Sequence, residues 1–218
     1  MKKMTDIVGV VKELIGPAAT EVIDYGLSMA PYIGELNQNY KISRAEKRIR
    51  ESKNQLIEIN NLLQSDLKAK EFMEKRIAPI FISDLIEDHE DSKINYLLNG
   101  FQNVFIEQKF EESIVLHYFD ILRGLRYADI RTLYYIAGLD DIYPSTFYFE
   151  GSEYDSISKS IYNKLSNLYL VDIMGRHGAI LGKIEPTPEN VCINKSLGKE
   201  FLLFIAQNEQ EKEIIRSL

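Results

Sequence analysis

The sequence contains a single cysteine and no tryptophan among its 218 residues. One cysteine, Cys192, excludes an internal disulfide framework and a cysteine-based metal site, and it is typical of a reducing cytoplasm. Six prolines and twelve glycines are few, so we expect long regular elements rather than extended loops. No apolar run is long enough for a signal peptide or a membrane-spanning helix, because charges such as Lys12 and Glu21 interrupt the N-terminal apolar segment. We therefore predict a cytoplasmic protein.

Motifs that carry enzyme chemistry are also missing. Neither GxxxxGK[ST] nor GxGxxG occurs, so nothing predicts a loop that cradles phosphate groups. The three histidines, His89, His117 and His177, lie far apart in the sequence, and no serine or cysteine has a nucleophile motif around it. We therefore predict that the chain is not an enzyme, has no catalytic residues, needs no cofactor and takes no small-molecule substrate.

The composition is that of a globular protein, with 45% hydrophobic and 27% charged residues, and the charge is unevenly distributed. Residues 40–76 carry ten basic and six acidic side chains, whereas residues 77–149 carry five basic and twelve acidic ones. DNA-binding proteins concentrate lysine and arginine on the element that reads DNA, because phosphate neutralisation supplies most of the affinity. Here the basic excess lies in residues 40–76 instead, outside the C-terminal region. We expect the two oppositely charged segments to pair with each other, either within one subunit or between subunits.

A long amphipathic helix is predicted from Ile42 to about Leu63. Apolar residues recur there at alternating three- and four-residue steps, with one polar position, at Ile42, Ala45, Ile49, Ser52, Leu56, Ile59 and Leu63. This seam suits either an intramolecular helical hairpin or a short coiled-coil dimer. The solvent face of the helix is predicted to be a basic interaction face formed by Lys41, Arg44, Lys47, Arg48, Arg50 and Lys53.

An acidic cluster at residues 84–91 holds the weak candidates for metal binding, which are Asp84, Asp88, His89 and Asp91. On a continuous helix, carboxylates four residues apart would lie on one face, and a histidine could complete a ligand set. The same polar run between two apolar stripes is more simply a solvated helix end or a loop, and we therefore predict no metal site.

Several shorter elements are predicted in the C-terminal half. They are a helix over 113–125 with Ser113 as its N-cap, a helix over 127–137 followed by Gly138, a β-prone segment at 147–149, a helix over 153–168, strands at 170–173 and 191–193, and a final helix over 196–207. The helix over 153–168 is predicted to bury a stripe formed by Ile157, Ile161, Leu165 and Leu168.

The order helix, helix, strand, long turn, strand, helix over about 125–207 resembles bacterial winged-helix domains. The runs LSNLYLVDI and LGKEFLLFI carry this resemblance. The predicted fold class is therefore mostly α: an apolar helical bundle or hairpin over residues 1–39, long amphipathic helices over 40–112, and a C-terminal winged-helix-like domain with a small β-wing over 113–218. The whole chain is also similar to uncharacterised bacterial mobile-element proteins and to the abortive-infection alpha family, which implies a role in phage defence.

A winged helix that reads DNA would insert the outward face of its second helix into the major groove. The residues that this role implies are Lys159, Ser160, Asn163 and Lys164 on the helix, with Arg176 and Lys183 on the wing. Two lysines and no arginine make a thin reading surface, since arginine supplies the commonest contact to guanine. We therefore expect a non-enzymatic helical scaffold that binds a partner protein or itself, rather than a membrane surface. The alternative is a DNA-binding transcriptional regulator with a helical dimerisation region.

Overall fold

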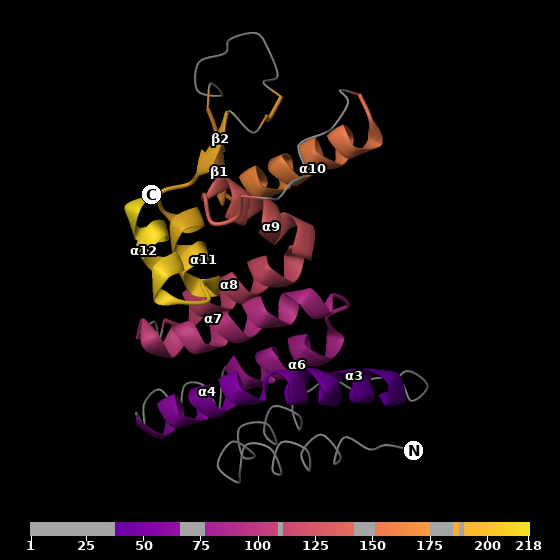
Figure 1. The fold of residues 1–218 in the computed structure, drawn as a ribbon, viewed down its shortest axis with the longest axis vertical. Helices are drawn as coiled ribbons and strands as arrows, with labels where there is room; N and C mark the ends of the chain where they lie inside the picture. The colour runs from indigo at the N-terminus through magenta and orange to yellow at the C-terminus, as the bar shows by residue number, and fades with distance from the viewer. Residues whose placement is uncertain (1–37, 66–76, 109–110, 142–150, 175–184, 188–189) are drawn as a thin grey trace. The chain divides into compact units, whose positions relative to one another are not determined.

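The computed structural model describes residues 38–65, 77–108, 111–141, 151–174, 185–187 and 190–218. These residues form nine α-helices, one short 3-10 helix and two β-strands (Figure 1). The predicted mostly helical fold class with two short strands is thereby confirmed. Within the described ranges, every helix is too short or too polar to cross a membrane.

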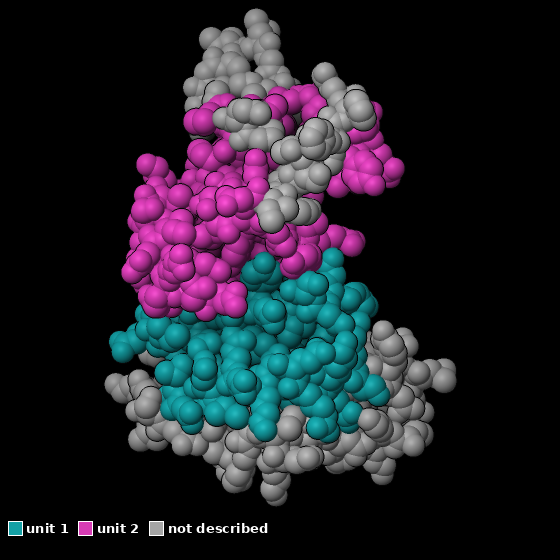
Figure 2. Space-filling model, viewed as in Figure 1, with its two compact units in different colours: residues 1–123 teal, residues 124–218 magenta. Residues whose placement is uncertain are grey.

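The chain divides into two compact units, residues 1–123 and residues 124–218 (Figure 2). The first unit ends with the helix that the sequence analysis assigned to the C-terminal domain. The predicted three-part division, with boundaries after residues 39 and 112, stays a prediction, and the apolar hairpin over 1–39 lies almost wholly outside the described residues.

The first unit contains α3 (Gln38–Glu51), α4 (Lys53–Ser65), α6 (Ala78–Glu87), the 3-10 helix η3 (Asp91–Lys93), α7 (Ile94–Ile106) and α8 (Glu112–Gly124). The predicted long helix is divided at Ser52 into α3 and α4. Helical hydrogen bonds nevertheless continue across this residue, since the Ser52 amide donates to the Arg48 carbonyl at 2.9 Å and the Leu56 amide donates to the Ser52 carbonyl at 3.0 Å.

The predicted seam of α3 and α4 lies in the core of this unit. Its buried members are Ala45, Ile49, Leu56 and Ile59. They pack inside a single chain, because α3 contacts α6 and α4 contacts α7. The core continues through aromatic pairs, with ring centroids 4.4 Å apart for Phe81 and Phe101, and 5.8 Å apart for Phe101 and Phe105.

Two helix ends test the predictions in detail. The helix α6 ends at Glu87, as expected from the polar run that follows it. Ser113, in contrast, is not the N-cap of α8, because the helix already includes Glu112. The carbonyl of Glu111 accepts the first helical amides, those of Ile114 and Val115, at 3.1 Å each.

The second unit contains α9 (Tyr127–Ile136), α10 (Glu153–Asn167), β1 (Val171–Ile173), β2 (Val191–Ile193), α11 (Leu197–Ile205) and α12 (Glu209–Ser217). The two strands pair antiparallel, with Val171 opposite Ile193 and Ile173 opposite Val191. These four side chains are buried, while Asp172 between them is exposed. The predicted β-prone segment at 147–149 lies outside the described residues.

The helix α11 packs very closely against the connection between α10 and β1. A Cβ atom placed on Gly198 would lie 2.0 Å from the carbonyl oxygen of Leu170, so only glycine fits there. Phe201, Leu202 and Ile205 of α11 are buried in the core of this unit. The helix α12, whose N-cap is Asn208, was not predicted from the sequence.

Candidate interaction surface

The orientation of α10 decides which of its side chains face solvent. The helix begins after Ser152, whose hydroxyl accepts a hydrogen bond from the Asp155 amide at 3.2 Å. It buries Tyr162 and Leu165. The predicted buried stripe is therefore wrong at Ile157, which is 48% exposed. Two apolar stripes are available on this helix, and Tyr162 rather than Ile157 fills the core.

Both lysines that were predicted to read DNA form ion pairs with carboxylates of their own unit. The Nζ atom of Lys159 lies 3.2 Å from an oxygen of Asp155 and 2.7 Å from an oxygen of Glu185. The hydrogen bond to Glu185, followed by the one to Asp155, raises the pKa of Lys159 above its usual range. The Nζ atom of Lys164 lies 2.5 Å from Asp129, a buried carboxylate.

The other predicted DNA contacts do not strengthen a reading surface. The side-chain amide of Asn163 donates to the Lys159 carbonyl at 2.8 Å within the same helix. Ser160 is exposed and uncharged. The wing residues Arg176 and Lys183 lie outside the described residues.

Large apolar side chains are exposed on α10, in its connection to β1 and directly after β1. They are Tyr154 (67% exposed), Ile157 (48%), Tyr169 (70%) and Met174 (55%). We name these four side chains the contact surface. They are the four most exposed large hydrophobic residues in the described part of the chain. Tyrosine and methionine are enriched in protein–protein interfaces, whereas lysine is depleted there.

Tyr169 has a backbone conformation that glycine normally adopts. Its φ angle is 56°, in the left-handed region. It occupies the position after the C-cap of α10, where its amide donates to the Ser166 carbonyl and the Leu170 amide donates to the Leu165 carbonyl, each at 3.0 Å. An exposed aromatic side chain at a strained position makes Tyr169 a candidate functional residue. The sequence signal that was missed is a tyrosine where this helix ending favours glycine.

The predicted basic face of α3 is only partly exposed. Arg48 was expected in solvent, but its side chain is only 2% exposed. Its Nη1 atom donates to the Leu85 carbonyl at 2.5 Å, and its Nη2 atom donates to the Asp88 carbonyl at 2.8 Å. Its Nε atom donates to the carboxylate of Asp91 at 2.9 Å. Arg48 is thus a buried cap on the end of α6.

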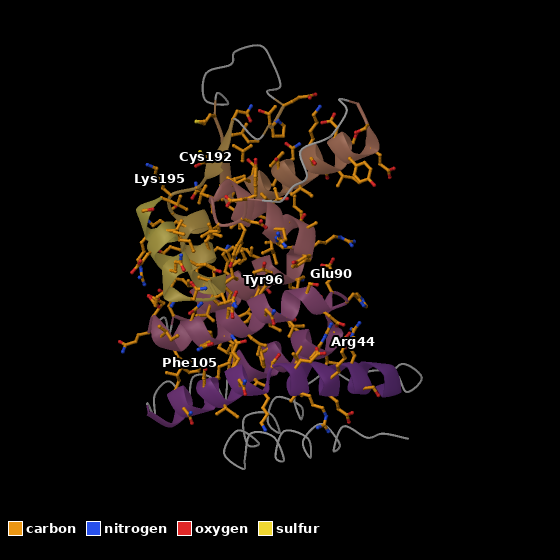
Figure 3. The ribbon with its side chains drawn as sticks, viewed as in Figure 1. Arg44, Glu90, Tyr96, Phe105, Cys192 and Lys195 are labelled. Carbon is orange, nitrogen blue, oxygen red and sulfur yellow. The ribbon has the colours of Figure 1, made fainter. Side chains whose placement is uncertain are left out.

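Arg44 (labelled in Figure 3) supports the same helix end, since its Nη2 atom donates to the Asp88 carbonyl at 2.5 Å. The physical reason is that the last carbonyls of a helix have no partner within the helix, and cations are stabilised beside them. Lys47 and Arg50 are exposed and Lys53 is half-buried, whereas the side chain of Lys41 lies outside the described residues.

The three aspartates of the acidic cluster each pair with a different cation. The two carboxylate oxygens of Asp84 accept from Arg123 at 2.8 and 3.0 Å, and burial raises the pKa of Asp84 against the lowering effect of Arg123. Asp88 lies 2.7 Å from the Nζ atom of Lys93. Because Arg48 binds Asp91, the predicted pairing between the basic and acidic segments occurs within one chain. His89 is exposed.

A polar hollow of about 230 Å³ lies where α3 meets α4, beside η3 and the start of α7. Its lining is Arg48, Glu51, Ser52, Asn54, Gln55, Asp91, Ile94 and Asn95. The guanidinium of Arg48 already binds Asp91, and the Gln55 amide donates to Asn99 at 2.8 Å. The polar groups that line the hollow are therefore amides and charged side chains such as Arg48, which already binds Asp91.

The potential catalytic side chains are not brought together. His117 is exposed on α8, and Cys192 is half-buried on β2, with its Sγ atom 3.8 Å from the Asp172 carbonyl (Figure 3). Within the described ranges, His, Cys, Asp and Glu side chains form no group of three that would hold a metal ion. His177 lies outside these ranges.

Comparison with known proteins adds no family to this description. No family model, curated protein or solved structure matches the chain.

Proposed function

We propose that the chain is a non-enzymatic helical interaction protein and that it binds a partner protein through the contact surface. The observation that carries the proposal is the contrast on α10 between lysines that are paired with carboxylates and apolar side chains that are exposed. Lys159 and Lys164 are held by carboxylates of the same unit, while Tyr154 and Ile157 are exposed. A helix that reads DNA needs a net positive outward face, whereas the charges of both lysines on this helix are balanced by adjacent carboxylates and apolar side chains are exposed.

The chemistry of the contact surface suits a protein partner. Tyrosine supplies a large apolar area with few rotatable bonds, and it is among the residues that dominate binding energy at interfaces. The strained backbone of Tyr169 supports the same role, because glycine at this position would remove the strain but also the side chain.

A winged-helix arrangement of the second unit is part of this proposal. The succession α9, α10, β1, β2, α11 and the antiparallel pairing of the strands support it. On this interpretation, the helix that usually faces DNA faces a protein. A role in bacterial phage defence stays a prediction of the resemblance described above, and so does the cytoplasmic location.

The proposal is tested by photocrosslinking in the cells that produce the protein. A photoreactive amino acid at position 157 should form adducts with a protein, and the same amino acid at position 214 should not. Ile214 is the matched control, since it is also a partly exposed isoleucine of the second unit. The substitution Ile157→Glu should abolish binding of the identified partner in purified form.

DNA binding is the outcome that would overturn the proposal. It would be shown by adducts with DNA at position 157, together with an affinity for duplex DNA that falls steeply with salt. Equal adducts at positions 157 and 214 would also refute a specific surface on α10.

A further inference from the structure

The outward side of α10 carries one stripe of exposed side chains with opposite charges near its two ends. Glu153, Ile157, Ser160, Lys164 and Asn167 follow one another at steps of four, three, four and three residues. Side chains with this spacing lie along one line of a helix, and Ile157 is the apolar member of this stripe. All five are exposed or half-exposed, so the described part of the unit leaves this stripe open to solvent. Tyr154 flanks the stripe.

The two ends of this stripe carry opposite charges. Glu153 lies in the first turn of α10 and Lys164 in its last turn. In an antiparallel pair of identical helices, the acidic end of each helix would lie against the basic end of the other. In a parallel pair, like charges would face each other and oppose association. The charge pattern therefore selects an antiparallel arrangement.

We propose that the partner at the α10 part of the contact surface, Ile157 and the flanking Tyr154, is a second copy of this chain, with the two α10 helices packed antiparallel about a two-fold axis. This inference rests on the proposed function. An axis that passes between Ser158 and Lys159 places Glu153 of one copy opposite Lys164 of the other, and Ile157 opposite Ser160. The small serine provides space for the isoleucine side chain of the other copy.

The ion pairs inside each unit are compatible with this arrangement. The ammonium group of Lys164 has three N–H donors, of which one reaches Asp129, and its side chain is 37% exposed. It can therefore also donate to Glu153 of the other copy. A single pair of helices buries less area than the roughly 1,200 Å² at the lower limit of stable interfaces, so the dimer is weak and reversible.

The test is sedimentation velocity of the full chain over a wide range of concentration, up to near-millimolar. The mass of the wild-type protein should rise towards that of a dimer. Ile157→Glu and Glu153→Lys should each keep the protein monomeric at every concentration, while the matched control Ile214→Glu should dimerise as the wild type does. Circular dichroism verifies that each variant is folded. A carbodiimide, which joins a carboxylate to an adjacent amine, should link Glu153 to Lys164 only in the dimer.

Two results would overturn the inference: a wild-type protein that stays monomeric, or a dimer that survives both α10 substitutions. Failure of the inference is distinguishable from failure of the proposed function. If position 157 captures a different protein in cells while the purified chain stays monomeric, only the second copy is refuted. If position 157 captures DNA, or captures no protein, both proposals fail.

Discussion

Replacing Arg48 with alanine removes the buried cap of α6 and should destabilise the first unit strongly. The Leu85 carbonyl loses its 2.5 Å donor, and the Asp88 carbonyl loses one of its two arginine donors. A hydrogen bond from a charged group contributes about 1.5–3 kcal/mol. The pair with Asp91 adds little, because the Asp91 side chain is 53% exposed and stays solvated when Arg48 is removed.

The total cost is reduced, because burying the guanidinium itself carries a desolvation penalty that the alanine variant does not incur. We therefore expect Arg48→Ala to lower the free energy of unfolding by about 3 kcal/mol. Arg48→Met, which keeps most of the side-chain volume, should lower it by about 2 kcal/mol.

Urea denaturation followed by circular dichroism measures this change, with the slope of the transition compared between variants. Lys47→Ala is the matched control, since Lys47 is the neighbouring cation and pairs with Glu51 in solvent. It should change stability by less than about 0.5 kcal/mol. Amide hydrogen exchange should locate the loss of protection at the end of α6. If the arginine variant costs no more than the lysine variant, Arg48 does not act as a cap.

Three further substitutions test other features. Tyr169→Gly should raise the thermal unfolding temperature slightly, because it removes about 1 kcal/mol of backbone strain, and it should weaken partner binding. A variant that unfolds at a lower temperature and also binds more weakly would refute the role of the strained tyrosine. Gly198→Ala should cost at least about 2 kcal/mol in urea denaturation, since its Cβ has no space beside Leu170, and an unchanged midpoint would contradict the close approach. Asp84 has a folded-state pKa raised above its usual 3.8, so its stabilising contribution is present at low pH and is lost as the pH rises through the folded-state pKa. The stability of the wild type relative to Asp84→Asn should therefore fall between acidic and neutral pH, and a difference that rises instead would contradict the raised pKa.

Apolar periodicity was sufficient to predict most elements, including both strands and the buried seam of α3 and α4. It did not predict the burial of Arg48, because this arginine lies at the edge of the seam, beside Ala45 and Ile49. Whether an edge position faces solvent depends on what packs there, and here it is the end of a helix about 40 residues away in sequence.

The candidate surface was harder to predict than the fold. On α10, the stripe through Ile157 and the stripe through Tyr162 both have helical spacing, and only the position of the rest of the unit decides which one is buried. The ion pair between Lys164 and Asp129 joins two helices, so local sequence does not reveal it. The helix α12 was missed because its sequence is mostly charged, and its stability comes from buried Ile215 and the Asn208 cap.

The capping of α6 by arginines of α3 has a kinetic consequence. The bonds to its last carbonyls span 37 to 44 residues of sequence, so they form only after a long loop has closed. The last turn of α6 should therefore be completed late in folding, after the apolar seam has brought the two helices together. A late contact affects the unfolding rate more than the folding rate. The two arginines should thus lower the unfolding rate of the first unit and have little effect on its folding rate.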